Sequence, residues 1–228
     1  MKALVIIPAR SGSRGIPGKN IKLLGDKPLI QYSIDAALKV FNKEDILVST
    51  DSKETKVIAE NCGLNVPFLR PDELATDFTS SQDVILHTID YTQQRGQNYD
   101  TVGLLQPTSP FRNAQHIEEA IKLYDKRLEM VVSVKVSDHN PYYTLYEESD
   151  NGFLTQSKKA KFTRRQDCPN VYAYNGAIYV MSIDALKTKS IAEFDKVKKY
   201  EMSELHSIDL DTPLDWDLAE IVLNKYLT

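Results

Sequence analysis

Residues 3–20 read ALVIIPARSGSRGIPGKN and join an apolar run to a basic, glycine-rich loop. The run Ala3–Ile7 is rich in branched residues and predicts a buried strand. The loop that follows holds three glycines and three cations, which are Gly12, Gly15, Gly18, Arg10, Arg14 and Lys19. Glycine lets a backbone bend tightly and approach a ligand, and cationic donors suit a triphosphate, whose oxygens only accept hydrogen bonds. The stretch therefore predicts a nucleotide site behind the first strand.

Two better-known phosphate loops do not fit this spacing. A P-loop needs a glycine five residues before the glycine of its Gly-Lys-Ser/Thr signature; Ser13 stands there, and Asn20 follows the lysine. The dinucleotide fingerprint is G-x-G-x-x-G, whereas this loop runs G-x-x-G-x-x-G. An ordinary basic turn between a strand and a helix stays open as the plain alternative.

Length, charge and cysteine content limit the classes of protein to which this chain can belong. A chain of 228 residues predicts one large α/β domain over residues 1–228. The net charge of −4 gives no basic field for nucleic acid, and no segment has the length of a signal peptide or a membrane span. Cys62 and Cys168 stand alone, outside any zinc or disulfide pattern, and predict free thiols in a cytoplasmic protein.

Apolar runs alternate with helical patterns along the chain. The expected strands are Ala3–Ile7, Ile46–Ser49, Val102–Leu105, Val131–Val136 and Ala177–Met181. The expected helices are Leu29–Val40, Ser52–Asn61, Ser80–Arg95, Ala114–Leu128 and Pro213–Tyr226. This alternation predicts a mainly parallel sheet covered by helices, with the site at the carboxyl ends of the strands.

The segment Ser137–Tyr174 breaks the alternation. Several tyrosines flank the turn-like stretch Ser149–Gly152, which favours a hairpin or arm extending from the sheet. The basic cluster Lys158–Arg165 follows, and a solvated basic loop is its plain interpretation.

Asp209 and Asp211 stand two residues apart in Ser207–Thr212. On an extended strand such residues point to the same face, and two carboxylates there repel each other unless a cation lies between them. Oxygen ligands beside a phosphate substrate favour magnesium. Asp51, which follows an expected strand, either lies near this pair or caps the next helix. The four histidines have no partner at metal-ligand spacing, so we expect surface or capping roles for them.

These motifs together resemble the CMP-sialic acid synthetases, or N-acylneuraminate cytidylyltransferases. The stretches that carry the resemblance are Ile7–Asn20, Ser49–Asp51, Leu69–Pro71, Ala75–Asp77, Ser80–Ser81, Leu105–Pro110, Asn175–Tyr179 and Ile208–Thr212. They occur in the order of that family and cover nearly the whole chain. The related Kdo cytidylyltransferases carry a glycine loop that fits this one poorly.

The resemblance implies a three-layer nucleotide-binding fold of the glycosyltransferase-A-like nucleotidyltransferase type. It also implies a homodimer in which the arm, residues 137–174, reaches the active site of the partner. The implied reaction joins CTP to a nonulosonic sugar acid: the anomeric hydroxyl attacks the α-phosphorus, and pyrophosphate leaves. Mg²⁺ is the implied cofactor, with Mn²⁺ as a substitute.

Residue roles follow from the same resemblance. Nucleotide binding falls to Ala9, Arg10, Ser11, Gly12, Lys19, Asn20, Arg70 and Ser81. Sugar binding falls to Gln106, Arg165, Asn175 and Tyr179, and metal binding to Asp209 and Asp211. The expected catalytic residues are Arg10, Lys19 and Asp211, the last through its metal on the attacking hydroxyl.

Two departures from the family lie on the sugar side. Ala173 stands where sialate enzymes carry an arginine, and Tyr143 stands where they carry a lysine of the arm. N-acylneuraminate is the expected acceptor, and legionaminic acid or another nonulosonic acid or Kdo is the alternative. A nucleotide-binding regulatory module without catalysis is the alternative from another class.

Overall fold

A six-stranded sheet with the order β10-β6-β9-β5-β1-β4 organises the computed structural model, which describes residues 2–227. Its strands are β1 (Ala3–Pro8), β4 (Ile46–Ser49), β5 (Thr101–Leu104), β6 (Met130–Val136), β9 (Tyr172–Ser182) and β10 (Val197–Glu201). All neighbours are parallel except that β9 runs antiparallel to both β5 and β6. The prediction of a mainly parallel sheet is confirmed.

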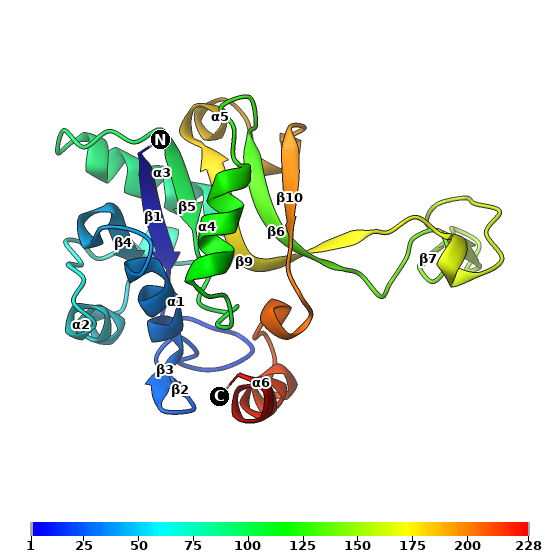
Figure 1. The fold of residues 1–228 in the computed structure, drawn as a ribbon, viewed down its shortest axis with the longest axis horizontal. Coiled ribbons are helices and arrows are strands. Elements are labelled where there is room, and N and C mark those ends of the chain that lie inside the picture. Colours follow the sequence, from blue (N-terminus) through cyan, green and yellow to red (C-terminus); the bar gives the residue numbers. More distant parts are fainter. Residues whose placement is uncertain (1, 228) are drawn as a thin grey trace.

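Helices cover both faces of this sheet, as Figure 1 shows. The helices α1 (Leu29–Leu38), α2 (Lys53–Asn61) and α4 (Ala114–Leu123) share one apolar cluster, and α3 (Ser81–Gln93) and α5 (Ile183–Thr188) share the other. Successive residues of β1 contribute to the two clusters in turn, Val5 and Ile7 to the first and Leu4 and Ile6 to the second. A strand buried on both faces reads as a continuous apolar run, which is why the sequence reveals it.

A third apolar cluster closes the carboxyl edge of the sheet. The last helix, α6 (Pro213–Tyr226), lies there beside the short hairpin of β2 (Leu23–Leu24) and β3 (Lys27–Pro28) (Figure 1). Ile16 of the glycine loop is buried in the same apolar cluster as Trp216 of this helix. Leu210 belongs to this cluster too, and it lies in the stretch Ser207–Thr212, which we call the acidic segment. Hydrophobic packing thus joins the two segments that the sequence marks as functional.

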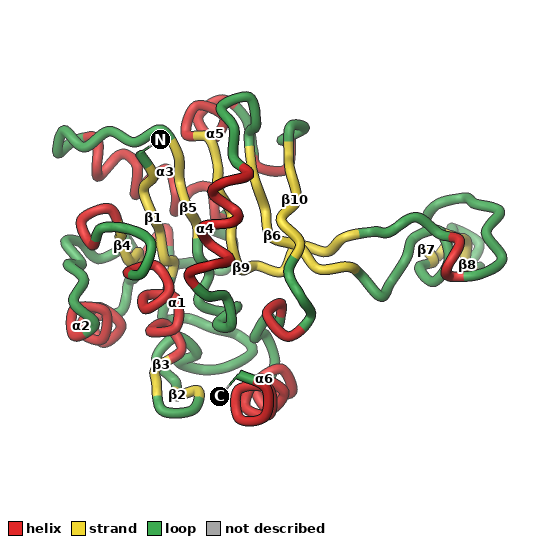
Figure 2. The backbone as a smooth tube through the Cα atoms, viewed as in Figure 1, coloured by secondary structure: helices red, strands yellow, loops and turns green. Residues whose placement is uncertain are grey.

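Beyond the sheet, β6 and β9 continue into a projecting arm, visible in Figures 1 and 2. The arm carries the hairpin of β7 (Tyr146–Glu148) and β8 (Leu154–Gln156). Phe153 and Leu154 near its turn are 73% and 69% exposed. The irregular segment of the sequence is therefore an extension from the sheet, and it presents apolar side chains to solvent.

Most expected elements occur within a few residues of their predicted bounds. The expected helix over Ala114–Leu128 ends at Leu123, because Tyr124 adopts an extended backbone with ψ 134°. The expected strand over Ala177–Met181 begins at Tyr172 instead. The sequence analysis missed β10 and α5. Short 3-10 helices add Lys43–Asp45, Asp72–Leu74, Arg165–Asp167, Ile191–Glu193 and Leu205–Ser207.

Among residues 2–227, no helix combines the length and apolar character needed to cross a bilayer.

Candidate active site

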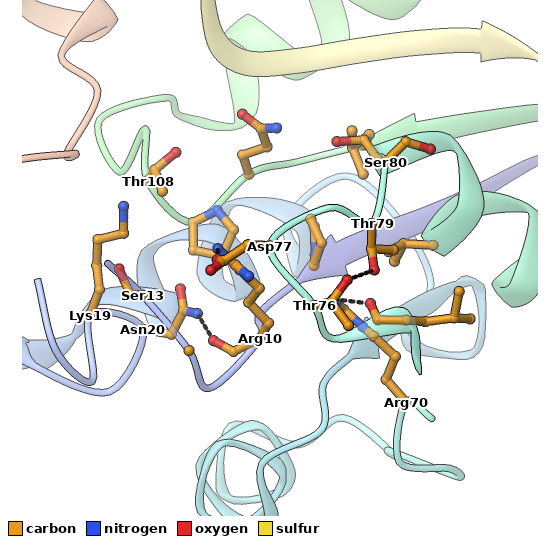
Figure 3. A pocket seen from close by; sticks show the side chains of 18 of the residues that line it. Arg10, Ser13, Lys19, Asn20, Arg70, Thr76, Asp77, Thr79, Ser80 and Thr108 are labelled. Carbon is orange, nitrogen blue, oxygen red and sulfur yellow. Dashed lines mark hydrogen bonds and ion pairs between the residues drawn. The ribbon is translucent and has the colours of Figure 1, made fainter. Parts of the chain in front are cut away.

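A cavity of about 380 Å³ opens at the carboxyl ends of the central strands, and Figure 3 shows it from close by. The expected residues that line it are Arg10, Gly12, Lys19, Asn20, Arg70, Ser81, Gln106, Asp209 and Asp211. They come from five separate parts of the chain. The fold thus brings together the residues that the sequence connects with a nucleotide, a metal and part of the sugar.

Hydrogen bonds fix the beginning of the glycine loop. The Ser11 backbone N–H donates to Asp51 Oδ1 at 2.8 Å, and its hydroxyl donates to Oδ2 of the same carboxylate. The Asn20 amide donates to the Arg10 carbonyl at 2.9 Å, closing the loop on itself. Asp51 does not cap α2, whose N-cap is Ser52, and its carboxylate instead holds the start of the glycine loop. Ala9 and Ser11 support the loop and do not line the cavity.

Asp77 pairs with two arginines of the loop. Its carboxylate accepts Arg10 Nη2 at 2.7 Å and Arg14 Nη2 at 2.6 Å, and Figure 3 shows Asp77 beside Arg10. Hydrogen bonds from these guanidinium groups lower the pKa of Asp77. Asp77 lies in the stretch Ala75–Asp77, which carries part of the family resemblance, but it was not among the predicted site residues. The local sequence, Thr76-Asp77-Phe78, does not indicate which residues Asp77 pairs with.

Lys19 connects the glycine loop to the acidic segment. Its buried ammonium group donates to the Leu210 carbonyl and lies 3.2 Å from Asp211 Oδ1. The backbones also touch here: a Cβ added to Gly15 would lie 1.8 Å from the Asp211 carbonyl oxygen. Only glycine fits at that position, so the loop needs Gly15 for close approach.

The two carboxylates of the acidic segment have different surroundings. The side chain of Asp211 is 72% exposed, whereas Asp209 Oδ1 is buried without a hydrogen-bond partner. Burial raises the pKa of Asp209, and the charge of Asp211 acts in the same direction. An ionised, buried oxygen without a donor is an unfavourable arrangement that a cation would relieve.

The residues present therefore fit a divalent cation held partly by its substrate. No cluster of three or more acidic, histidine or cysteine side chains suited to a metal occurs among residues 2–227. Two carboxylates are nevertheless enough for magnesium, because it takes one or two from the protein and completes its shell with phosphate and water.

Arg70 forms part of the cavity wall from a buried position. Its Nε donates to Ser49 Oγ at 3.0 Å, its Nη2 to the Ser49 carbonyl and its Nη1 to the Leu74 carbonyl at 3.5 Å, so it ties the end of β4 to the Asp72–Leu74 turn. Burial lowers the pKa of Arg70 to about 10. Ser81 lines the same wall as the first residue of α3. Both therefore contribute to the wall of the cavity.

The four expected sugar-binding residues are spread more widely, and only Gln106 lines the cavity. Tyr179 is partly buried in β9, with its ring centroid 6.2 Å from that of Tyr174, and burial raises its pKa to about 12. Arg165 lies on the arm and pairs with Asp138 at 2.7 Å. Asn175 is buried beneath the acidic segment.

Arg112 holds the backbone of Gln106 in place through a hydrogen bond. The sequence analysis did not assign Arg112 to the site. This fully buried guanidinium donates to the Gln106 carbonyl, to the Ala177 carbonyl at 2.9 Å and to Ser33 Oγ at 2.7 Å. Burial lowers the pKa of Arg112 to about 9. The loop that carries Gln106 is therefore tied to β9 and to α1 at once.

Histidines and cysteines take no part in the cavity. His116 completes the capping box of α4 with Asn113, and its ring contacts that of His206 at 4.6 Å. Cys62 and Cys168 are free thiols, as expected.

Comparisons with known proteins agree with this geometry. A family model described as cytidylyltransferase matches residues 4–225. N-acylneuraminate cytidylyltransferase from Escherichia coli is 39% identical over 231 residues, which cover 98% of this chain and 52% of that protein. CMP-N,N'-diacetyllegionaminic acid synthase from Legionella pneumophila is 35% identical over 221 residues, which cover 96% of this chain and 95% of that protein. The chain thus spans about half the length of the first relative and nearly all of the second.

Among solved structures, CMP:2-keto-3-deoxy-manno-octonic acid synthetase complexed with CTP aligns with a TM-score of 0.72. The two chains are 18% identical, and the alignment covers 99% of each. At this identity the likeness speaks for the fold alone, and it confirms the expected class of fold. The organisation as one domain over residues 1–228 stays a prediction.

We predict that Asp209→Asn stabilises the ligand-free protein. A carboxyl whose pKa folding raises destabilises the folded state at neutral pH, where it is ionised, so a neutral amide removes that cost. We expect the thermal midpoint at pH 7, measured by calorimetry without divalent ions, to rise by about 3–6 °C. Asp211→Asn, at the exposed member of the pair, serves as the control and should give no such rise. An unchanged or lower midpoint for Asp209→Asn would contradict the prediction.

We also predict a loss of stability in mild acid that His116 causes in part. Burial and the neighbouring His206 lower the pKa of His116 below 6.5, so the unfolded chain takes up the proton first. The contribution of the neutral His116 ring to the stability of the fold is therefore fully present above pH 6.5 and is lost as the pH falls below that value. Urea unfolding of His116→Gln, which keeps a capping-box residue, should show a weaker decline with falling pH than the wild type. The exposed His139→Gln should follow the wild type; parallel curves for all three proteins would refute the assignment.

Proposed function

Since this chain belongs to the cytidylyltransferase family, we propose that it transfers CMP from CTP to the anomeric hydroxyl of a nine-carbon sugar acid. Its reaction class is nucleotidyl transfer. In the proposed reaction the hydroxyl oxygen bonds to the α-phosphorus and gives up its proton to solvent, the bond from the α-phosphorus to the bridging oxygen breaks, and pyrophosphate leaves. The observation that carries the proposal is a single cavity in which the cationic glycine loop directly faces the Asp209–Asp211 pair.

Charge neutralisation by this chain's own residues is the core of the proposed mechanism. Arg10 and Lys19 line the cavity from the glycine loop and offer guanidinium and ammonium donors to the phosphate oxygens. Preorganised donors at a site where negative charge builds up lower the barrier, because no solvent has to reorient. In the ligand-free protein these two cations are paired with Asp77 and Asp211, so a triphosphate must compete with carboxylates for them.

Mg²⁺, with Mn²⁺ as a substitute, is the cofactor that we propose. Asp209 and Asp211 would hold it, and the unpartnered Asp209 Oδ1 supports this assignment. When bound, the ion supplies positive charge to the phosphate oxygens. Arg70 and Ser81 are proposed to bound the cytidine side of the cavity, and Gln106 to face the acceptor.

A homodimer completes the proposal. The arm carries apolar side chains that single chains rarely leave exposed together, among them Tyr146, Phe153 and Leu154. Arg165 lies on this arm, outside the cavity of its own chain. We propose that the arm docks on a second copy and presents Arg165 to the acceptor carboxylate bound there.

N-acylneuraminate is the first candidate acceptor, from the motifs shared with the sialate enzymes. N,N'-diacetyllegionaminic acid is the second, and two observations favour it: the Legionella relative matches this chain over nearly its whole length, and Ala173 replaces the arginine of the sialate pattern.

Pyrophosphate release tests the function directly. The purified protein is given CTP and Mg²⁺ with N-acetylneuraminate, N,N'-diacetyllegionaminic acid or Kdo in separate reactions. Release with the first acid supports the first candidate, and release with the second acid alone moves the acceptor while keeping the reaction. No release with any acid, from folded protein that still binds CTP, would contradict the proposal in favour of a non-catalytic nucleotide-binding module.

Asp211→Ala should lose turnover while the protein stays folded. Asp211 is largely exposed, so its removal creates no cavity, whereas the proposed metal loses a ligand. We expect kcat to fall by roughly 100-fold or more in the pyrophosphate assay, as for the loss of one preorganised electrostatic group. Asp217→Ala, at an exposed acid in α6, is the matched control and should keep full activity. Wild-type turnover in Asp211→Ala would remove this residue from the site.

A further inference from the structure

The side-chain amide of Asn175 has all of its hydrogen-bonding capacity taken up by the protein. Asn175 is only 2% exposed. Its Oδ1 accepts the Ser133 hydroxyl at 2.6 Å and the Ala177 N–H at 3.2 Å. Its Nδ2 donates to Ser207 Oγ at 2.9 Å and to Met202 Sδ at 3.4 Å. An amide offers two acceptor sites and two donors, so nothing remains for a ligand.

The bond to Ser207 reaches the acidic segment. Ser207 precedes Asp209 by two residues, and its hydroxyl donates in turn to the Ser203 carbonyl at 2.7 Å. On the far side of Asp209, the Leu210 N–H donates to the Thr108 carbonyl at 2.8 Å. The short stretch that carries the buried carboxylate is therefore held at both ends, once from β9 and once from the loop of Gln106.

The neighbouring residue, Gly176, shows how closely these parts meet. Its φ of +73° lies in the left-handed region that favours glycine. A Cβ added there would lie 2.9 Å from Gln106 Oε1 and 3.5 Å from Asp209 Oδ2. The expected acceptor-binding amide and the expected metal-binding carboxylate thus approach one point of the backbone, next to Asn175.

We infer that Asn175 is a positioning residue and not a sugar-binding one. Through Ser207 it sets the place of Asp209 relative to Gln106, and hence the place of the metal relative to the acceptor. A carboxylate with one buried oxygen that lacks a donor would otherwise move toward solvent, because hydration of its charge is strongly favourable. The inference rests on the proposed function for the metal and the acceptor, while the hydrogen bonds that carry it are independent of both.

Ser207→Ala tests this role without touching either substrate. The probe is Mn²⁺ binding to the complex of enzyme and CTP, followed by electron paramagnetic resonance in the absence of any sugar acid. We expect Mn²⁺ affinity to fall roughly 10-fold, the size typical when the partner of a metal ligand is removed. Ser133→Ala, which loosens Asn175 from the opposite side, should give a loss in the same direction. Thr92→Val removes a buried hydroxyl that bonds only within α3, and it should bind Mn²⁺ like the wild type.

Steady-state kinetics separate this role from contact with the sugar. In Ser207→Ala we expect a lower kcat and a higher Mg²⁺ requirement, with the KM for the sugar acid unchanged within about twofold, which is the signature of a group that does not bind the acceptor. Asn175→Ala should behave in the same way. An unchanged Mn²⁺ affinity in both variants, with a raised KM for the sugar acid in Asn175→Ala only, would overturn the inference and restore the sugar contact.

The Mn²⁺ measurement keeps the two proposals apart. It needs CTP but no acceptor, so it stands even when no sugar acid supports turnover. Wild-type protein that turns over but binds no Mn²⁺ with CTP would overturn the positioning role together with the metal. Where Ser207→Ala fails to fold, Ser133→Ala decides alone.

Discussion

The backbone contact between Gly15 and Asp211 is the constraint on which the rest of the cavity depends. The two residues are separated by almost the whole chain, yet there is no room for a single methyl group between them. Lys19 reinforces the contact by donating to the Leu210 carbonyl, and Ile16 and Leu210 pack into the same apolar cluster beneath it. A hydrogen bond and an apolar cluster thus act at the same place. Separating the glycine loop from the acidic segment would break the hydrogen bond and expose the cluster to solvent.

Charge is the second organising quantity of the site. The cations of the glycine loop are paired with acids, Arg10 with Asp77 and Lys19 with Asp211, whereas Asp209 is left with an oxygen that has no donor. A buried carboxylate oxygen without a donor lowers stability, so its presence beside the cationic loop is the pattern expected of function and not of folding. A ligand that brings a cation and several phosphate oxygens together meets both needs at once, since the cation relieves Asp209 and the oxygens take over the guanidinium donors.

The sequence revealed those parts of the site whose chemistry is local. The strand before the glycine loop is buried on both faces and reads as a continuous apolar run, and the alternation of Asp209 and Asp211 places both carboxylates on one extended segment. The strand β10 escaped notice because it lies at the sheet edge and buries mainly Tyr200 among charged neighbours. Asp77 could not be assigned, since its partners Arg10 and Arg14 are distant in the sequence and nothing local specifies the pairing. Asn175 shows the same limit, because burial and three tertiary partners decide what its amide does.

One chain supplies more of the proposed nucleotide half of the site than of the proposed acceptor half. In the proposed nucleotide half, buried hydrogen bonds tie Arg70 to β4 and the acidic segment to β9, and Lys19 ties the glycine loop to the acidic segment. On the acceptor side only Gln106 lines the cavity, while Arg165 lies on the arm among exposed residues. A carboxylate-bearing acceptor would then meet its charged partner only when another element closes over the cavity. In the proposed reaction, the buried network would hold the side where the phosphorus reacts, whereas selection among sugar acids would fall to the acceptor side, to which we assign Ala173, a partly buried residue of β9.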